Sequence, residues 1–198
     1  MWTPSGEQGK TALMAAASQG DARLVKALLN AGADVNARNR TGGTPLIYAA
    51  AAGNGETVQL LLAHGAQLNH QSVNGWSALM IAAAKGHAGL VEWLGRQGAD
   101  VNMPDIYGWT PLMRATYNGH QAVVKVLLGQ PGIELERLND HGQTVLHLAV
   151  IREDAGIVRQ LLEYGARTDV KDFAGNTPRS ISAALGDQQM LALLTQAK

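Results

Sequence analysis

Gly108-Trp109-Thr110-Pro111-Leu112 is one copy of a short run that organises the whole chain of 198 residues. The run has the form glycine, any residue, threonine or serine, any residue, leucine. Its other complete copies span residues 9–13, 42–46, 75–79 and 142–146, and a degenerate copy spans residues 175–179. The hydroxyl residues of successive copies lie 33, 33, 33, 34 and 33 positions apart. A period of this length predicts a repeat architecture.

Each copy begins a unit that the pattern predicts to be a pair of helices. Threonine followed by proline, as at Thr110-Pro111, is typical of an N-cap with proline at the first helical position. A glycine ends the first helix in five units, and apolar residues at i, i+1 and i+4 predict the buried side of a second helix. A Gly-Ala pair ends the second helix, and a polar stretch predicts an extended turn. One unit cannot bury its own apolar side, so the units are predicted to stack as an all-α solenoid.

The units resemble the ankyrin repeat. The matching fragments are Gly-Trp-Thr-Pro-Leu at 108–112, Gly-His at 86–87 and 119–120, and Leu-Leu-Asn-Ala-Gly-Ala-Asp-Val-Asn at 28–36. The resemblance covers about residues 6 to 198 and implies helix-turn-helix units with projecting β-turn fingers, a curved surface that binds other proteins, and no enzymatic activity. We expect one domain over 1–198 with about six repeats, the first and last capping the stack: 6–38, 39–71, 72–104, 105–138, 139–171 and 172–198.

Composition excludes several classes of function. Sixteen Lys and Arg balance sixteen Asp and Glu. The chain therefore lacks the excess of cations that is required for non-specific binding to nucleic acids or for binding to an anionic membrane. The absence of cysteine excludes disulfides, thiol chemistry and Cys-based zinc sites. No apolar stretch is long enough to span a membrane, and residues 1–7 have neither the basic region nor the apolar run of a signal peptide. A cytoplasmic location is the default expectation, and a secreted or periplasmic form that has lost its leader is the alternative.

Known catalytic motifs are missing from the sequence. It has no nucleophile elbow, phosphate-binding loop or His-Glu-x-x-His. His64 and His70 are close in sequence but lack a third ligand, and a triad of His147 with Asp140 and a serine would be a chance assembly. We therefore expect no enzyme activity, no cofactor and no metal.

Departures from the repeat pattern carry the position-specific information. The motif histidine of the family is present only as His147, and Met80 and Met113 are among the residues that replace it elsewhere. These methionines are predicted to fill the seam between repeats, and an adaptable apolar contact surface is the alternative. The fifth repeat has Glu153-Asp154 in place of glycine and a polar residue, which indicates either drift on a solvated loop or a charged subsite. Arg179, Ser180 and Ser182, among others, predict a polar cap.

The predicted binding surface combines finger tips with the first helix of each repeat. Four of the nine aromatic residues fall at predicted exposed positions of two adjacent repeats, and Trp and Tyr are enriched at binding hot spots. The alternative for each tryptophan is packing on a neighbouring finger, and Tyr48 and Trp93 are interpreted as framework. The predicted aromatic anchors are Trp76, Tyr107, Trp109 and Tyr117, with Ile106 beside them and Lys85, Arg114, Asn118, His141 and Arg152 for polar selectivity.

Together these features predict a non-enzymatic protein-interaction module that binds a protein partner on its concave face. It would act as a scaffold, an adaptor, or an inhibitor or protector of its partner, and would be a monomer when free. One alternative is a structural component that associates with itself through the aromatic residues. A small-molecule or enzymatic role is the other, and it would require a deep polar pocket.

Overall fold

The computed structural model describes residues 9–196 of the chain. Over this range the protein is all-α, with twelve helices and no strand. The chain forms two compact units, Met1–Asp100 and Val101–Lys198. The predicted all-α repeat architecture is therefore confirmed for the part of the chain that is described.

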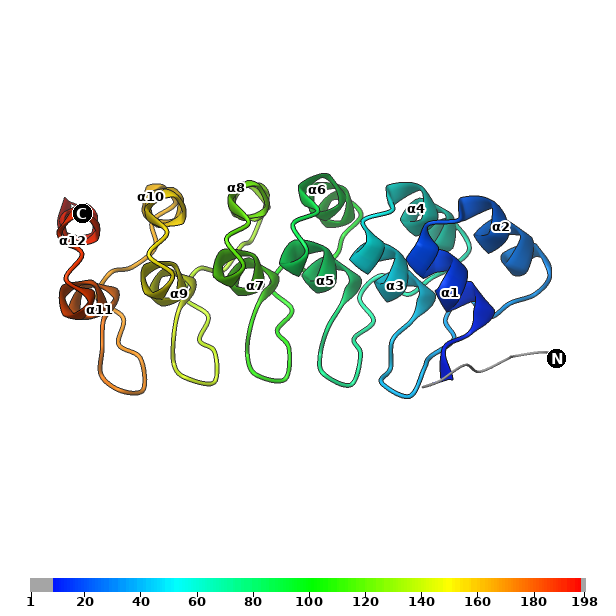
Figure 1. Cartoon of the computed structure of the whole chain (residues 1–198), viewed down its shortest axis with the longest axis horizontal. Coiled ribbons are helices and arrows are strands. Elements are labelled where there is room, and N and C mark those ends of the chain that lie inside the picture. The colour runs from blue at the N-terminus through cyan, green and yellow to red at the C-terminus, as the bar shows by residue number, and fades with distance from the viewer. Residues whose placement is uncertain (1–8, 197–198) are drawn as a thin grey trace. The chain divides into compact units, whose positions relative to one another are not determined.

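The first unit contains three helix pairs. Helices α1, α3 and α5 are the inner helices, and they pack in sequence order, α1 on α3 and α3 on α5. Each inner helix also packs on the outer helix that follows it, and the finger loops lie on the opposite side of the inner row (Figure 1). The bounds are α1 (Ala12–Gln19), α2 (Ala22–Asn30), α3 (Pro45–Ala52), α4 (Gly55–Ala63), α5 (Ala78–Ala84) and α6 (Ala88–Arg96).

The second unit repeats this arrangement with α7, α9 and α11 as inner helices and α8, α10 and α12 as outer helices. Its finger loops again lie beyond the inner row. The bounds are α7 (Pro111–Tyr117), α8 (Gln121–Leu128), α9 (Val145–Ile151), α10 (Ala155–Glu163), α11 (Pro178–Leu185) and α12 (Gln188–Gln196).

The predicted helix signals act as expected. Thr110 is the N-cap of α7, and its hydroxyl accepts a hydrogen bond from the Met113 amide at 3.2 Å. The five glycines that follow inner helices all have positive φ, between 71° and 83°, where a side chain would be strained. Glu153 occupies the same place after α9 with φ of 54°, a left-handed conformation without glycine. The fifth repeat therefore forms the same turn, although the backbone of Glu153 is strained.

The inner helices form the core with small side chains and methionines. Met80 and Met113 are at most 1% exposed, which confirms that they fill the interior. The alternative, that they form an apolar contact surface, is wrong because their thioethers lie where a partner cannot reach them. Alanines beside them are also fully buried, and their small side chains let neighbouring helices approach closely: Ala49, Ala50, Ala82 and Ala83.

His147 takes the buried methionine position in the fifth repeat. Its Nδ1 accepts a hydrogen bond from the Thr144 amide at 3.1 Å, and Nε2 lies 3.2 Å from the Asn176 carbonyl, to which it donates. Burial lowers the pKa of His147, since desolvation penalises the charged imidazolium, although the Asn176 carbonyl opposes that shift. Asp140 pairs instead with His141 at 2.9 Å, so the two triad candidates have separate partners.

From the second repeat onward, one polar residue closes each described finger. Asn39 and Asn139 use Oδ1 to accept two backbone amides of their own finger, at 2.7 to 3.0 Å, and thereby close the turn. Neighbouring fingers within a unit are linked by a backbone hydrogen bond, as from the Asp140 amide to the Tyr107 carbonyl at 2.9 Å. This bonding holds the finger tips of each unit in register.

The last repeat differs from its predicted role at one residue. Ser180 is exposed, as a polar cap requires, and closes a capping box with Thr177. Ser182, predicted to lie on the polar outside, is fully buried, and its hydroxyl donates to the Asp187 carbonyl at 3.2 Å. It faces inward because its backbone position falls on the packed side of α11, and the hydrogen bond compensates the buried hydroxyl.

Candidate functional site

The site begins at the buried carboxylate of Asp105, in the finger of the fourth repeat. Its side chain is fully shielded from solvent, and Oδ1 accepts the amides of Tyr107 at 2.9 Å and Trp109 at 3.0 Å. Oδ2 faces Arg114 on α7, whose Nε lies 3.0 Å away and whose Nη2 also contacts it. One side chain thus shapes the finger and anchors a guanidinium from the neighbouring helix.

Arg114 continues into a row of alternating rings and guanidinium groups. Its guanidinium lies 4.6 Å from the centre of the Trp109 ring, and that ring meets Tyr117 edge to face at 5.3 Å and 88°. The guanidinium of Arg152, at the end of α9, lies 5.4 Å from the Tyr117 ring. We call Arg114, Trp109, Tyr117 and Arg152 the Arg–aromatic row. Each contact is an attraction between a cation or ring edge and an aromatic face.

The two ends of the Arg–aromatic row differ in charge balance. Arg114 is only 21% exposed and its charge is compensated by Asp105. Arg152 is exposed and has no ion pair among the described residues. Tyr117 beside it is 44% exposed. The row therefore runs from a half-buried guanidinium, whose charge Asp105 compensates, to the exposed guanidinium of Arg152.

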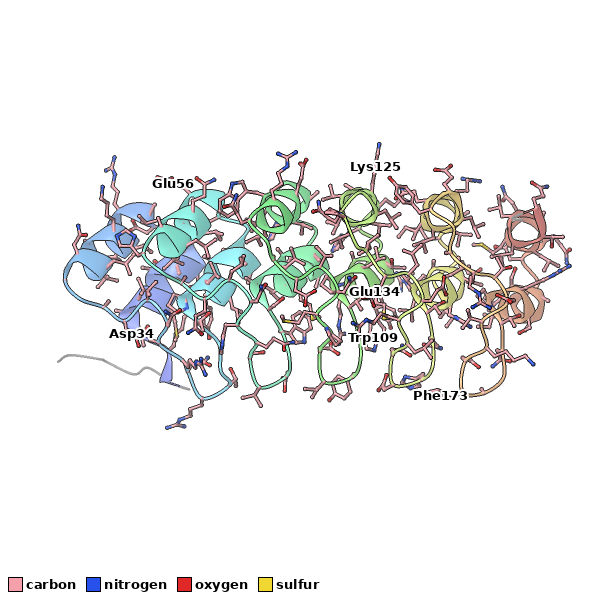
Figure 2. All side chains as sticks on the ribbon, turned by 180° about the vertical axis from the view of Figure 1, so that it is seen from behind. Asp34, Glu56, Trp109, Lys125, Glu134 and Phe173 are labelled. Carbon is pink, nitrogen blue, oxygen red and sulfur yellow. The ribbon has the colours of Figure 1, made fainter. Side chains whose placement is uncertain are left out.

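The tryptophans are less exposed than the sequence predicted. Trp109 is half-buried because Arg114 and Tyr117 cover its ring, and Figure 2 shows it between α7 and the finger loops. Trp76 is half-buried as well, and its amide donates to Ser72 Oγ at 3.1 Å. Both residues are therefore partly framework, and the exposed aromatic surface of the fourth repeat is carried by its tyrosines.

Further predicted residues extend the surface at the finger tips. Ile106 and Tyr107 are 58% and 52% exposed at the tip of the fourth finger. His141 is exposed on the next finger, with Nδ1 at 2.9 Å from Asp140 Oδ1. Asn118 is exposed as the C-cap of α7, next to Tyr117. The apolar tip and three members of the Arg–aromatic row thus come from the fourth repeat, and Arg152 comes from the fifth.

Two predicted residues belong to the first unit. Trp76 lies in the finger of the third repeat, and Lys85 is exposed as the C-cap of α5. The residues of the Arg–aromatic row, all in the second unit, contact one another directly. The membership of Trp76 and Lys85 in a common surface with them stays a prediction.

In the second repeat an uncharged hydrogen-bonded pair takes the place of the Asp105–Arg114 ion pair. Asn39 Nδ2 donates to the Tyr48 hydroxyl at 2.9 Å, at the positions that Asp105 and Arg114 occupy in the fourth repeat. Lys10 Nζ lies 4.8 Å from the centre of the Tyr48 ring. Asp105 was not predicted from the sequence. The available signal was a carboxylate at the finger position and an arginine nine residues later, where the second repeat has asparagine and tyrosine.

Other kinds of site find little support within residues 9–196. No group of three or more His, Asp or Glu side chains in this range is placed to hold a metal ion. A hollow of about 470 Å³ is lined by Glu134, Leu135, Glu136 and Arg137, and it is widely open to solvent. Such a hollow does not enclose a small molecule. No helix in the described range is both long and apolar enough to cross a membrane.

Comparison with known families gives matches along most of the chain. A family model described as ankyrin repeats in three copies matches residues 3–72 and 64–139. A second, described as ankyrin repeats in many copies, matches residues 130–182.

Individual relatives match over a shorter stretch. NF-kappa-B inhibitor alpha from Gallus gallus is 47% identical over 58 residues, which is 29% of this chain and 18% of the relative. The rat protein of the same name is 43% identical over 58 residues, with the same coverage. The NF-kappa-B p105 subunit from Gallus gallus is 46% identical over 56 residues, or 28% of this chain and 6% of the relative. The chain thus spans less than a fifth of the length of these relatives.

Proposed function

The chain belongs to the ankyrin-repeat family, and we propose that it holds a protein partner against the fingers and inner helices of its repeats. The observation that carries the proposal is the Arg–aromatic row beside the apolar finger tip. Arg, Trp and Tyr are the residues most enriched at binding hot spots. Here a buried carboxylate that also closes the finger fixes Arg114, Arg114 contacts the Trp109 ring, and Trp109 contacts Tyr117.

Preorganisation is the physical advantage of this surface. A flexible arginine loses about 0.5–1.5 kcal/mol of side-chain freedom when a partner immobilises it. Asp105 and Trp109 already restrict Arg114, and Tyr117 already restricts Arg152. Less ordering remains to be done on association, so more of the contact energy contributes to affinity.

The proposed role is to mask, tether or position the partner. The Arg–aromatic row contains no nucleophile next to a general base, so it supports binding and not chemistry on the partner. Two relatives are, by name, inhibitors of another protein, and masking is a role that a repeat stack can perform by occupying a surface. Whether this chain masks or tethers depends on which partner surface it covers.

Capture of a partner from native lysate of the source organism tests the proposal. The wild-type chain is compared with a Tyr107→Ala, Tyr117→Ala double variant, because these two rings are exposed and their removal leaves the core intact. Tyr164→Ala is the matched control, since Tyr164 is 51% exposed at the end of an outer helix. We expect a protein retained by the wild type and the control and lost from the double variant.

Two outcomes would count against the proposal. Retention of the same protein by all three chains would place the interface elsewhere on the molecule. If no protein is retained and light scattering shows that the wild type forms oligomers that the double variant does not, the aromatic surface serves self-association, the alternative function.

A further inference from the structure

Charge is distributed unequally between the inner and outer helices. Among the described residues, four of the six inner helices carry a cation in the helix or its caps, and none of the six carries a carboxylate. The outer helices and their caps contain both signs, with carboxylates at Asp21, Glu56, Glu92, Asp154, Glu163 and Asp187. The formal net charge of the chain is zero, so the inner side is cationic through placement and not through an excess of basic residues. The inner-helix cations are Lys85, Arg114, Arg152 and Arg179.

Arg152 is the inner-helix cation whose environment best fits an external ligand. The Tyr117 ring restricts its guanidinium, and no ion pair among the described residues uses its charge. A guanidinium that lies over a ring can still donate its N–H groups to a carboxylate. Glu153 follows directly in sequence, but it leaves the helix in a left-handed turn and forms no ion pair with Arg152.

We propose that the partner presents an acidic polypeptide segment to the second unit, with a carboxylate that binds Arg152 and an apolar side chain that packs on Ile106 and Tyr107. This inference rests on the proposed function and names the chemistry of the partner. Charge complementarity supports it, since inner helices without carboxylates do not repel an acidic segment. A carboxylate–guanidinium pair next to exposed aromatic groups combines orientation with buried apolar area.

The observations favour a polypeptide over a nucleic acid. Phosphate chains are bound through many cations along a stripe, and this chain has zero net charge. Asp140 stands at the tip of the neighbouring finger, where it would repel every phosphate of a backbone that crosses it, whereas a peptide can place an uncharged residue there and its carboxylate at Arg152. The tip of the fourth finger is apolar over Ile106, which suits a side chain better than a sugar or phosphate.

Selection from a displayed library of random twelve-residue peptides on the full chain tests the inference. We expect selected peptides to be enriched in Asp and Glu relative to the unselected library. Their affinity for Arg152→Gln is expected to be at least about tenfold weaker than for the wild type, the loss of one charged hydrogen-bonded contact. Arg152→Lys should recover part of the affinity by keeping the charge. Lys125→Gln is the control, because Lys125 is exposed on outer helix α8 and points away from the fingers (Figure 2).

The possible failures separate this inference from the proposed function. Peptides that lose affinity with Tyr117→Ala but are neither acidic nor sensitive to Arg152→Gln would overturn the inference and leave the binding surface in place. Acidic peptides whose affinity changes with neither Tyr117→Ala nor Arg152→Gln would show that the binding site lies elsewhere, and this would count against both proposals. If no peptide is selected, an acidic segment is not the ligand. If a 20-nucleotide single-stranded DNA binds as tightly as the peptides and depends on Arg152, the assignment to a polypeptide is wrong.

Discussion

The second and fourth repeats place different side chains at the same two positions of a finger and its inner helix. In the second repeat Asn39 and Tyr48 form a neutral hydrogen bond of 2.9 Å. In the fourth, Asp105 and Arg114 form an ion pair whose carboxylate is fully buried. Both residues on the finger side use Oδ1 to accept two backbone amides of the finger.

The two repeats show that closing the finger and fixing a guanidinium are separate roles of the same side chain. Closing the finger requires only an oxygen acceptor at the first position, which asparagine and aspartate both provide. The charge adds a fixed guanidinium, and this guanidinium is the start of the Arg–aromatic row. The Asp105–Arg114 pair can therefore replace the Asn39–Tyr48 pair while the finger keeps the same backbone hydrogen bonds.

The largest expected effect is the loss of the buried carboxylate. Asp105→Ala should lower the free energy of unfolding by about 3 kcal/mol, because it leaves a mostly buried guanidinium uncompensated and two finger amides without an acceptor. Asn39→Ala should cost less, about 1–2 kcal/mol, because no charge remains behind. Urea unfolding of the full chain, followed by circular dichroism, measures both.

Replacing Asp105 and Arg114 by the residues of the second repeat tests the charge alone, because the acceptor of the finger amides is kept. The double variant Asp105→Asn, Arg114→Tyr installs the neutral pair of the second repeat and should stay within about 1 kcal/mol of the wild type. Equal losses for Asp105→Ala and Asn39→Ala would mean that the charge contributes nothing to stability in the fourth repeat.

A smaller change in stability is expected at the turn after the inner helix, where the fifth repeat has Glu153 and the fourth has Gly119. Glu153→Gly should stabilise the chain by about 1 kcal/mol, because glycine adopts the left-handed conformation without strain. Gly119→Ala should destabilise it by a similar amount, since Gly119 has φ of 73°, and the open space around it leaves backbone strain as the cost. For a chain of this size each change shifts Tm by about 2–4 °C in thermal melts. A Glu153→Gly variant that melts below the wild type would show that the glutamate makes a compensating contact.

Acid sensitivity should distinguish the fifth repeat from those with methionine. Burial lowers the pKa of His147 below its ordinary value of 6.5, so the unfolded chain binds a proton more readily than the folded chain. The stability associated with neutral His147 is complete above pH 6.5 and is lost as pH falls below that value towards the lowered pKa. In melts from about pH 7.5 to 5, His147→Met should show a shallower fall in Tm than the wild type. Parallel curves would assign the acid sensitivity to other groups.

The smallest effect is expected for an exposed ion pair of similar chemistry. Arg96 and Glu92 are paired on α6 with side chains 70% and 44% exposed, whereas the carboxylate of Asp105 is fully buried. Glu92→Gln should change the free energy of unfolding by only about 0.3 kcal/mol, because water and salt screen the pair. Urea unfolding at two salt concentrations measures the change. A loss approaching that of Asp105→Ala would show that burial does not account for the difference between the pairs.

Local signals predicted most of the fold and part of the site. The N-caps, the glycine turns and the buried methionines follow from residues close in sequence and from their recurrence in each repeat. Ile106, Tyr107 and Tyr117 are exposed as predicted because finger tips and helix ends point away from the core. The half-burial of Trp109 was not predicted, since it depends on Arg114 and Tyr117 folding over its ring.

Repetition in the sequence by itself determined the architecture, because each unit carries its own caps and turn and can bury its apolar side only against another unit. Only the tertiary structure decided which polar residues pair. Asp105 and Arg114 belong to a finger and a helix, and Arg152 reaches Tyr117 from the next repeat. Such contacts depend on how a finger folds against its helix and how two repeats stack, and periodicity carries no information on either.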